Sequence, residues 1–463
     1  MQRSGGWRRV LAVAGLVVVA GAGTAAPAAA ASPSAYDPGV FGFGNNDYGQ
    51  LGHGTNVNDQ GLGHVTGLPV DVRQIAAGGN TSAALLPDGT VRMWGAALNG
   101  MSSGTVPVRV AGLTGITQIA VSQNGGDLFA VGPGGGVWAV GHNADGQLGN
   151  GSTADDFSPA PVPGLTGITQ VSAGAYDTVA VRSDGTAWAW GSNLYGELGD
   201  GTMTDRLAPR QVRGLSGITQ VSAGTYYTVA VRSDGTVWAW GLNGNGELDG
   251  SANKTAHPTP EQVPGLSGIT QVATDGFHTL ALRSDGTVWA WGTNDHGEVG
   301  DGTTATRFSP VPLSLAAVTQ IAVGSAASAA IRSDGTLLTW GDDNSGGLDT
   351  SACCRLPVNP VPAPAAGLTF VSQIAFGEMY GLALSTLPAG LVPVPSVIGD
   401  TQAQASQDLQ AAGLALGTVG SALDPTCDNI GTVLSQRPAA GSYAPRGTHV
   451  SMTIGKPNPR LCS

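Results

Sequence analysis

Few residues of this 463-residue chain have the types and spacing that catalysis or metal binding requires. Gly100-Met101-Ser102-Ser103-Gly104 has the letters of a nucleophile elbow, but that motif needs a strand-to-helix turn in an α/β sheet, and here it lies in a degenerate outer turn. Asn143-Ala144-Asp145-Gly146 carries oxygen ligands, yet no twelve-residue calcium loop ends in glutamate. The seven histidines lack metal-ligand spacing. The sequence therefore predicts no catalytic residue, no metal site and no cofactor, and it indicates that the protein is not an enzyme.

A second set of side chains is better suited to recognising another molecule. These residues follow the first strand of successive copies of a repeat, so we expect them near the axis of the fold on one face. The set comprises Tyr176, Asp177, Tyr226, Tyr227, Phe277, His278, Met379 and Tyr380. Aromatic side chains are enriched in binding hot spots. Two interpretations stay open, a ring-shaped patch for a protein or peptide partner and local packing against neighbouring repeats.

A repeat of about 50 residues supplies the elements that position these side chains. The segment 170–191 recurs almost unchanged at 220–241, 271–292 and 320–341, with weaker copies beginning at Gln74 and Gln118 and a truncated copy at 373–384. Two apolar strands in each of the four full copies flank a Ser-Asp-Gly-Thr turn, which predicts a hairpin whose sheet must be covered on both faces. The recurring tryptophans are predicted to form the core between sheets: Trp94, Trp188, Trp190, Trp238, Trp240, Trp289, Trp291 and Trp340.

The order of the strand signals predicts how the repeats close into a ring. In each repeat a Gln-Ile or Gln-Val pair opens the first strand, and an aromatic-Gly or Val-Gly pair ends the third. The first ending pair, Phe43-Gly44, comes before the first opening pair, Gln74-Ile75, so the chain starts and finishes within a blade. The N-terminal strand around 40–44 should complete the blade that contains 374–384. The sequence thus predicts an all-β, seven-bladed β-propeller over residues 40–386, closed by the N-terminal strand. The 73 glycines and 28 prolines agree with a turn-rich β fold and argue against a helix-rich one.

The repeat resembles that of the regulator of chromosome condensation family. The resemblance rests on Trp190-Gly191-Ser192-Asn193-Leu194-Tyr195-Gly196-Glu197-Leu198-Gly199-Asp200-Gly201-Thr202 and the hairpin before it, and it covers about residues 40–385. It implies a propeller; the family's founder is a nuclear guanine nucleotide exchange factor, and secreted bacterial relatives include inhibitors of β-lactamases. The family's His-Thr pair is kept only at His278-Thr279. We expect the loops at this position to have diverged as a binding surface.

The repeat stops at a linker, residues 387–391. The sequence predicts a separate small α+β domain over 392–456, followed by a tail at 457–463. A helix is expected over 403–412, with strands around Val433 and over 449–454. The segment 431–441, with its Gln-x-Pro-x-x-Gly element, makes this domain similar to a PASTA domain. Some members of that family bind peptidoglycan fragments or β-lactams, so the resemblance implies a cell-wall ligand.

The first 31 residues have the pattern of a signal peptide, with Arg3, Arg8 and Arg9 before an apolar stretch and an Ala-rich end, and residues 32–39 then form a linker. We therefore expect a secreted or wall-associated protein, with the export route left open between the general and twin-arginine systems. Four cysteines in an exported chain allow three pairings. A bond between Cys427 and Cys462 would brace the small domain, whereas the adjacent Cys353 and Cys354 leave their redox state open.

The charge balance narrows the functions that this architecture could carry. A formal net charge of −12 has the wrong sign for a nucleic-acid binder. The favoured hypothesis is an exported, monomeric, non-catalytic binding protein, with the propeller holding a protein or peptide and the small domain holding peptidoglycan. The alternative is an inhibitor of a β-lactamase or penicillin-binding protein. Guanine nucleotide exchange is a remote alternative that rests on the family resemblance alone.

Overall fold

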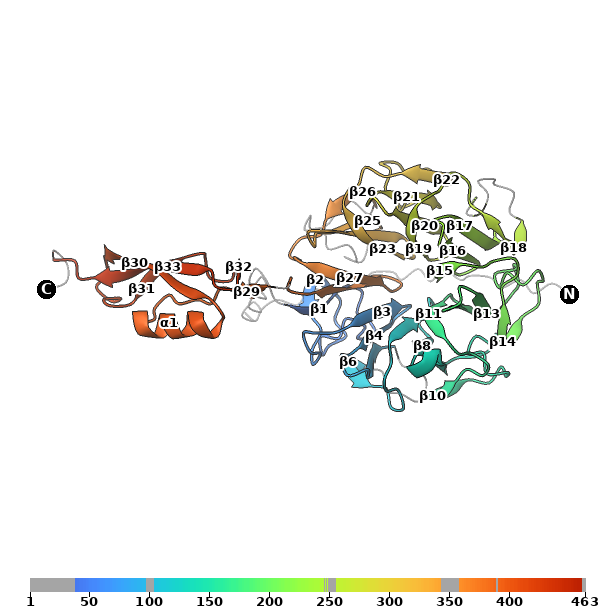
Figure 1. Ribbon diagram of the computed structural model, residues 1–463, viewed down its shortest axis with the longest axis horizontal. Coiled ribbons are helices and arrows are strands. Elements are labelled where there is room, and N and C mark those ends of the chain that lie inside the picture. The colour runs from blue at the N-terminus through green and yellow to red at the C-terminus, as the bar shows by residue number, and fades with distance from the viewer. Residues whose placement is uncertain are drawn as a thin grey trace, which may run out of the picture. The chain divides into compact units, whose positions relative to one another are not determined.

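The structure is a computed structural model that describes residues 38–96, 104–244, 246, 248, 255–342, 358–388 and 390–459. The predicted signal peptide, Met101 to Ser103, Cys353, Cys354 and Cys462 lie outside the described residues. Seven four-stranded antiparallel sheets form the blades of a propeller (Figure 1). Their first strands lie side by side around a central axis, which confirms the predicted architecture.

The blades follow one another along the chain, and we number them in that order. Blade 1 contains β3 (Gln74–Gly78), β4 (Thr81–Leu85), β5 (Val91–Gly95) and β6 (Gly104–Arg109); blade 2 contains β7 (Gln118–Val121), β8 (Asp127–Val131), β9 (Val137–Gly141) and β10 (Asp156–Pro161), with a 3₁₀ turn at Pro133–Gly135. Blade 3 contains β11 (Ile168–Ala173), β12 (Asp177–Arg182), β13 (Ala187–Gly191) and β14 (Arg206–Gln211); blade 4 contains β15 (Ile218–Ala223), β16 (Tyr227–Arg232), β17 (Val237–Leu242) and β18 (Ala256–Gln262). Blade 5 contains β19 (Ile269–Thr274), β20 (His278–Arg283), β21 (Val288–Gly292) and β22 (Arg307–Pro312); blade 6 contains β23 (Val318–Gly324), β24 (Ala327–Arg332), β25 (Leu337–Asp342) and β26 (Val358–Pro364).

Blade 7 joins the two ends of the propeller, as the order of strand signals predicted. It contains β27 (Val371–Phe376), β28 (Tyr380–Ser385), β1 (Gly39–Gly44) and β2 (Asp59–His64). β1 pairs with β28 over its whole length, from Gly39 opposite Ser385 to Gly44 opposite Tyr380. The N-terminal strand is therefore an inner member of the last sheet, and its loss would leave β2 without a partner and one edge of β28 unpaired.

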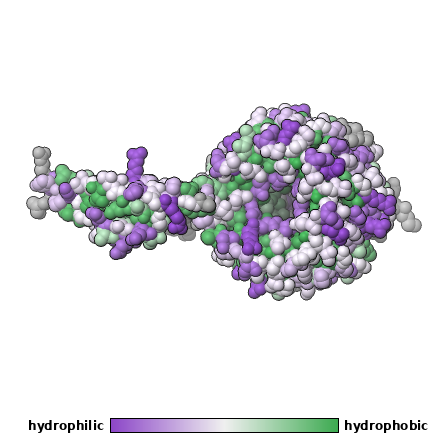
Figure 2. Space-filling model, viewed as in Figure 1, coloured by the Kyte–Doolittle hydropathy of each residue, from purple (hydrophilic) through white to green (hydrophobic). Residues whose placement is uncertain are grey.

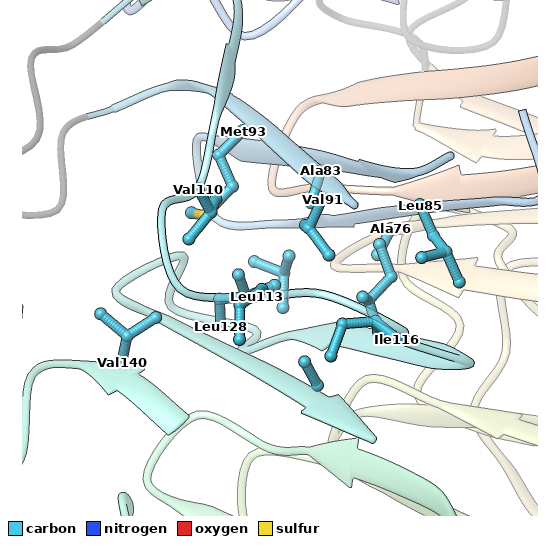
Figure 3. Close-up of a cluster of buried hydrophobic side chains, with 13 residues drawn as sticks. Ala76, Ala83, Leu85, Val91, Met93, Val110, Leu113, Ile116, Leu128 and Val140 are labelled. Carbon is cyan, nitrogen blue, oxygen red and sulfur yellow. The ribbon is translucent and has the colours of Figure 1, made fainter. Parts of the chain in front are cut away.

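Apolar side chains from facing blades fill the space between them. Figure 3 shows one such cluster, in which Leu85 and Val91 of blade 1 meet Leu128 and Val140 of blade 2. Trp190, Trp240, Trp291 and Trp340 are fully buried in equivalent clusters, as predicted. Trp188, Trp238 and Trp289 are only partly buried. Each of these three lies two residues before a buried tryptophan on the same face of the strand and packs against the same cluster, so it forms the partly exposed margin of the predicted core.

One glycine of the repeat is required by the tryptophan of the next blade. Gly199 has φ of 65°, and a Cβ at this position would lie 2.8 Å from the Nε1 atom of Trp240. The same indole N–H donates to the carbonyl oxygen of Glu197 at 2.7 Å. The Gly-Glu-Leu-Gly segment at 196–199 of blade 3 therefore packs against and hydrogen-bonds the Trp240 indole of blade 4.

Glutamines at the start of the first strands connect neighbouring blades near the axis. The amide of Gln220 donates from Nε2 to the carbonyl oxygen of Val272 at 2.9 Å and accepts from the Val272 N–H at 2.8 Å. Gln373 makes the equivalent contacts to the backbone of Arg73 and Ile75, so blade 7 is connected to blade 1 in the same way. These bonds satisfy backbone groups at the inner edge of each sheet, which would otherwise be left unpaired.

The small C-terminal domain has its own hydrophobic core. It contains β29 (Leu391–Pro393), α1 (Gln402–Ala411), β30 (Ala415–Leu423), β31 (Val433–Arg437), β32 (Tyr443–Pro445) and β33 (His449–Lys456). β33 lies between β30, to which it is parallel, and β31, to which it is antiparallel. The helix and the strands β31 and β33 agree with the prediction, whereas β29, β30 and β32 were not predicted. In the part of the chain that the structure describes, no helix has the length and hydrophobicity to span a membrane.

Candidate functional site

The loops between the first and second strands of the blades converge at one mouth of the propeller axis, and we call them together the loop rim. They span residues 79–80, 122–126, 174–176, 224–226, 275–277, 325–326 and 377–379. Backbone hydrogen bonds connect several of them, including Gly79 N–H to the Gln123 oxygen at 2.8 Å and Glu378 N–H to the Gly79 oxygen at 2.8 Å. The loop rim is thus a connected surface assembled from all seven blades.

Gln123 of blade 2 reaches across the mouth to blades 4 and 5. Its Nε2 atom donates to the carbonyl oxygens of Ala223 at 2.9 Å and Thr274 at 3.2 Å, and its Oε1 atom accepts from the Thr225 hydroxyl at 3.1 Å. The side chain therefore closes part of the opening. Figure 2 shows that one face of the propeller is hollowed at its centre.

Two neighbouring cavities lie beside this bridge. The first, which we call the apolar recess, has a volume of about 360 Å³, and its lining includes Phe277, Phe376, Met379 and residues 324–327. The second, the axial recess, has a volume of about 320 Å³ and includes Gln123, Asn124 and Asp275 in its wall. Both recesses share Phe277 and Glu378, so a ligand that fills one touches the edge of the other.

The residues predicted to form a binding patch fall into two groups. Tyr176, Phe277 and Met379 are 40%, 44% and 49% exposed on the loop rim. Tyr226 is partly buried and packs edge-on against Tyr195, with ring centroids 5.2 Å apart. These four side chains lie where the sequence predicted and are available to a partner.

The other four predicted residues require a correction. Each is the first residue of the second strand of its blade, and each is buried: Asp177, Tyr227, His278 and Tyr380. The hydroxyl of Tyr380 donates to the Thr81 oxygen of blade 1 at 2.6 Å, and Nε2 of His278 is 2.8 Å from the Ser328 hydroxyl of blade 6. They pack between blades because neighbouring residues of extended backbone point in opposite directions, so only one member of each predicted pair faces solvent.

Several residues of the site were not predicted as ligand-contacting positions. Asp275, Glu378 and Gln123 line the axial recess, and Tyr195 reaches the loop rim from the loop after β13. None of them stands out in a single repeat, because their neighbours in the site come from other blades. Among the described residues, no group of three or more His, Cys, Asp or Glu side chains is placed to hold a metal ion.

Buried carboxyl groups lie beneath the loop rim in blades 2 and 3. Burial raises the pKa of Asp127 from 3.8 to about 7, although the Ser122 hydroxyl opposes the rise. Burial also raises the pKa of Asp177 well above its usual range, and the nearby Glu197 carboxyl adds to this effect. These groups favour the protonated form in the folded protein.

We expect the stability of the propeller to fall as the pH rises from about 4 to about 7. The unfolded chain releases the Asp127 proton near pH 3.8, whereas the folded protein holds it until about pH 7. Above that pH the penalty is complete and corresponds to about 4 kcal/mol. Asp127→Asn should therefore raise the unfolding free energy at pH 8 and leave it nearly unchanged at pH 4. Urea unfolding at both pH values checks this, with the exposed Asp71→Asn as the control; equal effects at the two pH values would contradict it.

Comparison with protein families finds three matches. Residues 35–317 match the RCC1-like domain, residues 318–346 match the regulator of chromosome condensation (RCC1) repeat, and residues 392–456 match the PASTA domain. Among curated proteins, the chain is 30% identical over 288 residues to the ultraviolet-B receptor UVR8 of Arabidopsis thaliana, which covers 59% of this chain and 53% of that protein. It is 28% identical over 284 residues to the human E3 ubiquitin-protein ligase HERC2, which covers 58% of this chain and 5% of the ligase. The chain thus spans about half or much less of the length of these relatives.

Solved structures show the same fold at low sequence identity. Prp20p from Saccharomyces cerevisiae superposes with a TM-score of 0.66 at 20% identity, covering 76% of this chain and 92% of that one. Human WBSCR16 superposes with a TM-score of 0.64 at 21% identity, covering 75% and 100%.

Proposed function

Because the chain belongs to the RCC1-like domain family and carries a C-terminal PASTA domain, we propose that it is an exported, non-catalytic binding protein. The loop rim would hold a protein or peptide partner, and the PASTA domain would hold cell-wall peptidoglycan. Export is proposed from the signal-peptide pattern of residues 1–31. We also propose that Cys427 and Cys462 form a disulfide bond, as their positions in the sequence predict.

The observation that carries this proposal is the apolar recess at the loop rim. Phe277 and Met379 stand at its edge with about half of their surface exposed, although a fully packed loop would bury them. Large apolar side chains beside a preformed recess, with a polar surround, are typical of a binding site. The alternative of local packing explains Tyr226, which rests on Tyr195, but it leaves Phe277 and Met379 without the contacts that would bury them.

An inhibitor of a secreted or wall enzyme is the narrower form of the same proposal. In that case the partner on the loop rim is a β-lactamase or a penicillin-binding protein, and the enzyme loses activity on binding. A propeller that binds a partner but changes neither β-lactam hydrolysis by a β-lactamase nor peptidoglycan cross-linking by a penicillin-binding protein would leave only the broader form.

The proposal is tested by capturing partners from the culture fluid and wall fraction of the producing cells. The bait is the full chain, compared with the double variant Phe277→Ala, Met379→Ala. We expect a protein retained by the wild type to be retained at least about tenfold more weakly by the double variant, because residues at the centre of an interface contribute most of its affinity. Phe308→Ala is the matched control, because Phe308 is an aromatic side chain of similar exposure, 41%, on the outer strand β22. Equal retention by all three chains would show that the loop rim is not the binding surface.

Peptidoglycan binding is measured separately by sedimentation with purified cell walls. The seven clusters of buried side chains in the propeller contain no residue after 384, and the eighth lies within 392–454, so a chain that ends at Pro388 keeps the propeller core intact. We expect the full chain to sediment with walls and the shortened chain to stay in solution. Sedimentation of both would assign wall binding to the propeller.

A further inference from the structure

We propose that the two recesses of the loop rim together receive a basic side chain, arginine or lysine, that stands next to an apolar side chain in the partner. This inference rests on the proposed function of the loop rim and specifies the chemistry of what it binds. The axial recess would take the cationic group and the apolar recess its apolar neighbour.

The first support is Asp275, a buried carboxylate residue in the wall of the axial recess. Asp275 is only 7% exposed, and its Oδ1 atom accepts from the N–H groups of Phe277 at 2.9 Å and His278 at 3.1 Å. Nδ1 of His278 lies 3.4 Å from the same oxygen. The other oxygen, Oδ2, is buried without a hydrogen-bond partner. An unsatisfied buried acceptor is costly, so a ligand donor that displaces the Asp275 side chain toward the recess and bonds Oδ2 would remove that cost.

A second carboxylate stands at the boundary between the two recesses. Glu378 is exposed, belongs to the walls of both recesses, and forms none of the ion pairs found among the described residues. Asp342 lines the apolar recess as a third acid. Among the described residues that line the two recesses, none is Arg, Lys or His. The imidazole of His278 lies against Asp275 and offsets that charge, so Glu378 is the carboxylate that chiefly makes the recesses favour a cation over a neutral or acidic group.

The arrangement fits an organic cation better than a metal ion. Among the described residues, no group of three or more side chains of the types that ligate metals is gathered here. A guanidinium or ammonium group needs only two carboxylates and neighbouring carbonyl oxygens, and the aromatic ring of Phe277 at the shared edge can accept it by a cation–π contact.

The two recesses also fix the neighbour of the basic residue. They share Phe277, Phe376, Glu378 and residues 324, 325 and 377, so their contents must be adjacent. Phe376 and Met379 give the apolar recess room for an aliphatic or aromatic side chain. A partner loop that presents a basic and an apolar residue side by side meets both requirements.

The test is a peptide array of Ac-Ser-Gly-X-Z-Gly-Ser-amide in which X and Z take every pair of the twenty residues, probed with the full chain. We expect the strongest signals from pairs of Arg or Lys with Leu, Met, Phe, Tyr or Trp. The leading Arg peptide is then titrated against its citrulline form, which has the same shape without the charge. Its affinity should exceed that of the citrulline form by about tenfold, and the difference should shrink as salt is added.

Two variants in the recesses and one control variant test whether the Arg peptide binds there. Asp275→Asn keeps an oxygen for the N–H groups of Phe277 and His278, and Glu378→Gln changes an exposed side chain, so the fold should be retained in both. Each should weaken binding of the Arg peptide by about tenfold, whereas the exposed Asp71→Asn should not change it.

The outcomes separate this inference from the proposed function. Binding of apolar pairs that is lost in Phe277→Ala but does not depend on a basic residue would overturn the inference and leave the loop rim as a binding surface. The absence of any bound peptide would also overturn it, and the proposed function would then be decided by the partner-capture experiment.

Discussion

A chain that begins at Asn45, and therefore lacks β1, is expected to lose the folded propeller. β1 is an inner strand of blade 7, paired with β28 on one side and β2 on the other. Val40, Phe41 and Phe43 are buried in the two clusters that join blade 7 to its neighbours. Their burial contributes about 1.5–3 kcal/mol each, and the sum is comparable to the whole stability of a domain, about 5–15 kcal/mol.

Thermal unfolding and gel filtration check this expectation, with the chain 38–463 as the control. The control should melt cooperatively and elute as a compact protein, whereas the chain from Asn45 should aggregate or melt without a cooperative transition. A shortened chain that melts at the control's temperature would show that the ring does not need its N-terminal strand.

The second large effect is expected at Trp240. Its indole is fully buried among side chains of blades 3 and 4, including Val179, Leu198 and Ile218, and its N–H satisfies the carbonyl oxygen of Glu197. Trp240→Ala would leave a cavity between two blades and an unpaired carbonyl, so we expect a loss of about 3–5 kcal/mol in unfolding free energy. Denaturant unfolding measures this loss directly.

Trp238 provides a matched control in the same strand. It is only partly buried, its N–H bonds to the Thr236 hydroxyl at 3.1 Å, and the Arg232 guanidinium lies 5.7 Å from its ring centre. Trp238→Ala should therefore cost only about 1 kcal/mol. Similar losses in the two variants would mean that the indoles contribute equally, contrary to their different burial.

Much of the fold could be predicted because each blade repeats the same local signals. The Asp-Gly-Thr hairpins form as expected: Gly235 has φ of 77°, and the Thr236 N–H bonds to the Asp234 carboxylate at 3.0 Å. The C-terminal domain was predicted less completely. β30, over Ala415–Leu423, contains Gly417 and Gly420, which have low strand propensity, and it becomes a strand by pairing with β33.

The candidate site was predicted only in part. The position of the first-to-second-strand loops follows from the repeat, and Phe277 and Met379 are exposed there. Their chain neighbours His278 and Tyr380 were assigned to the same surface because both members of each pair have types suited to recognition. His278 and Tyr380 are the first residues of their second strands, and there their side chains point into the space between blades and are buried.

The sequence by itself determined the number of blades, the N-terminal closure and the face that carries the variable loops, because these depend on signals within 50 residues or on their order along the chain. Only the tertiary structure decided which side chains meet at the axis. Gln123 bonds to carbonyl oxygens 100 and 151 residues away, and Asp275 of blade 5 shares a recess with Glu378 of blade 7. Such contacts form only when the ring closes and brings loops from separate blades to one mouth, so no local pattern of residues can encode them.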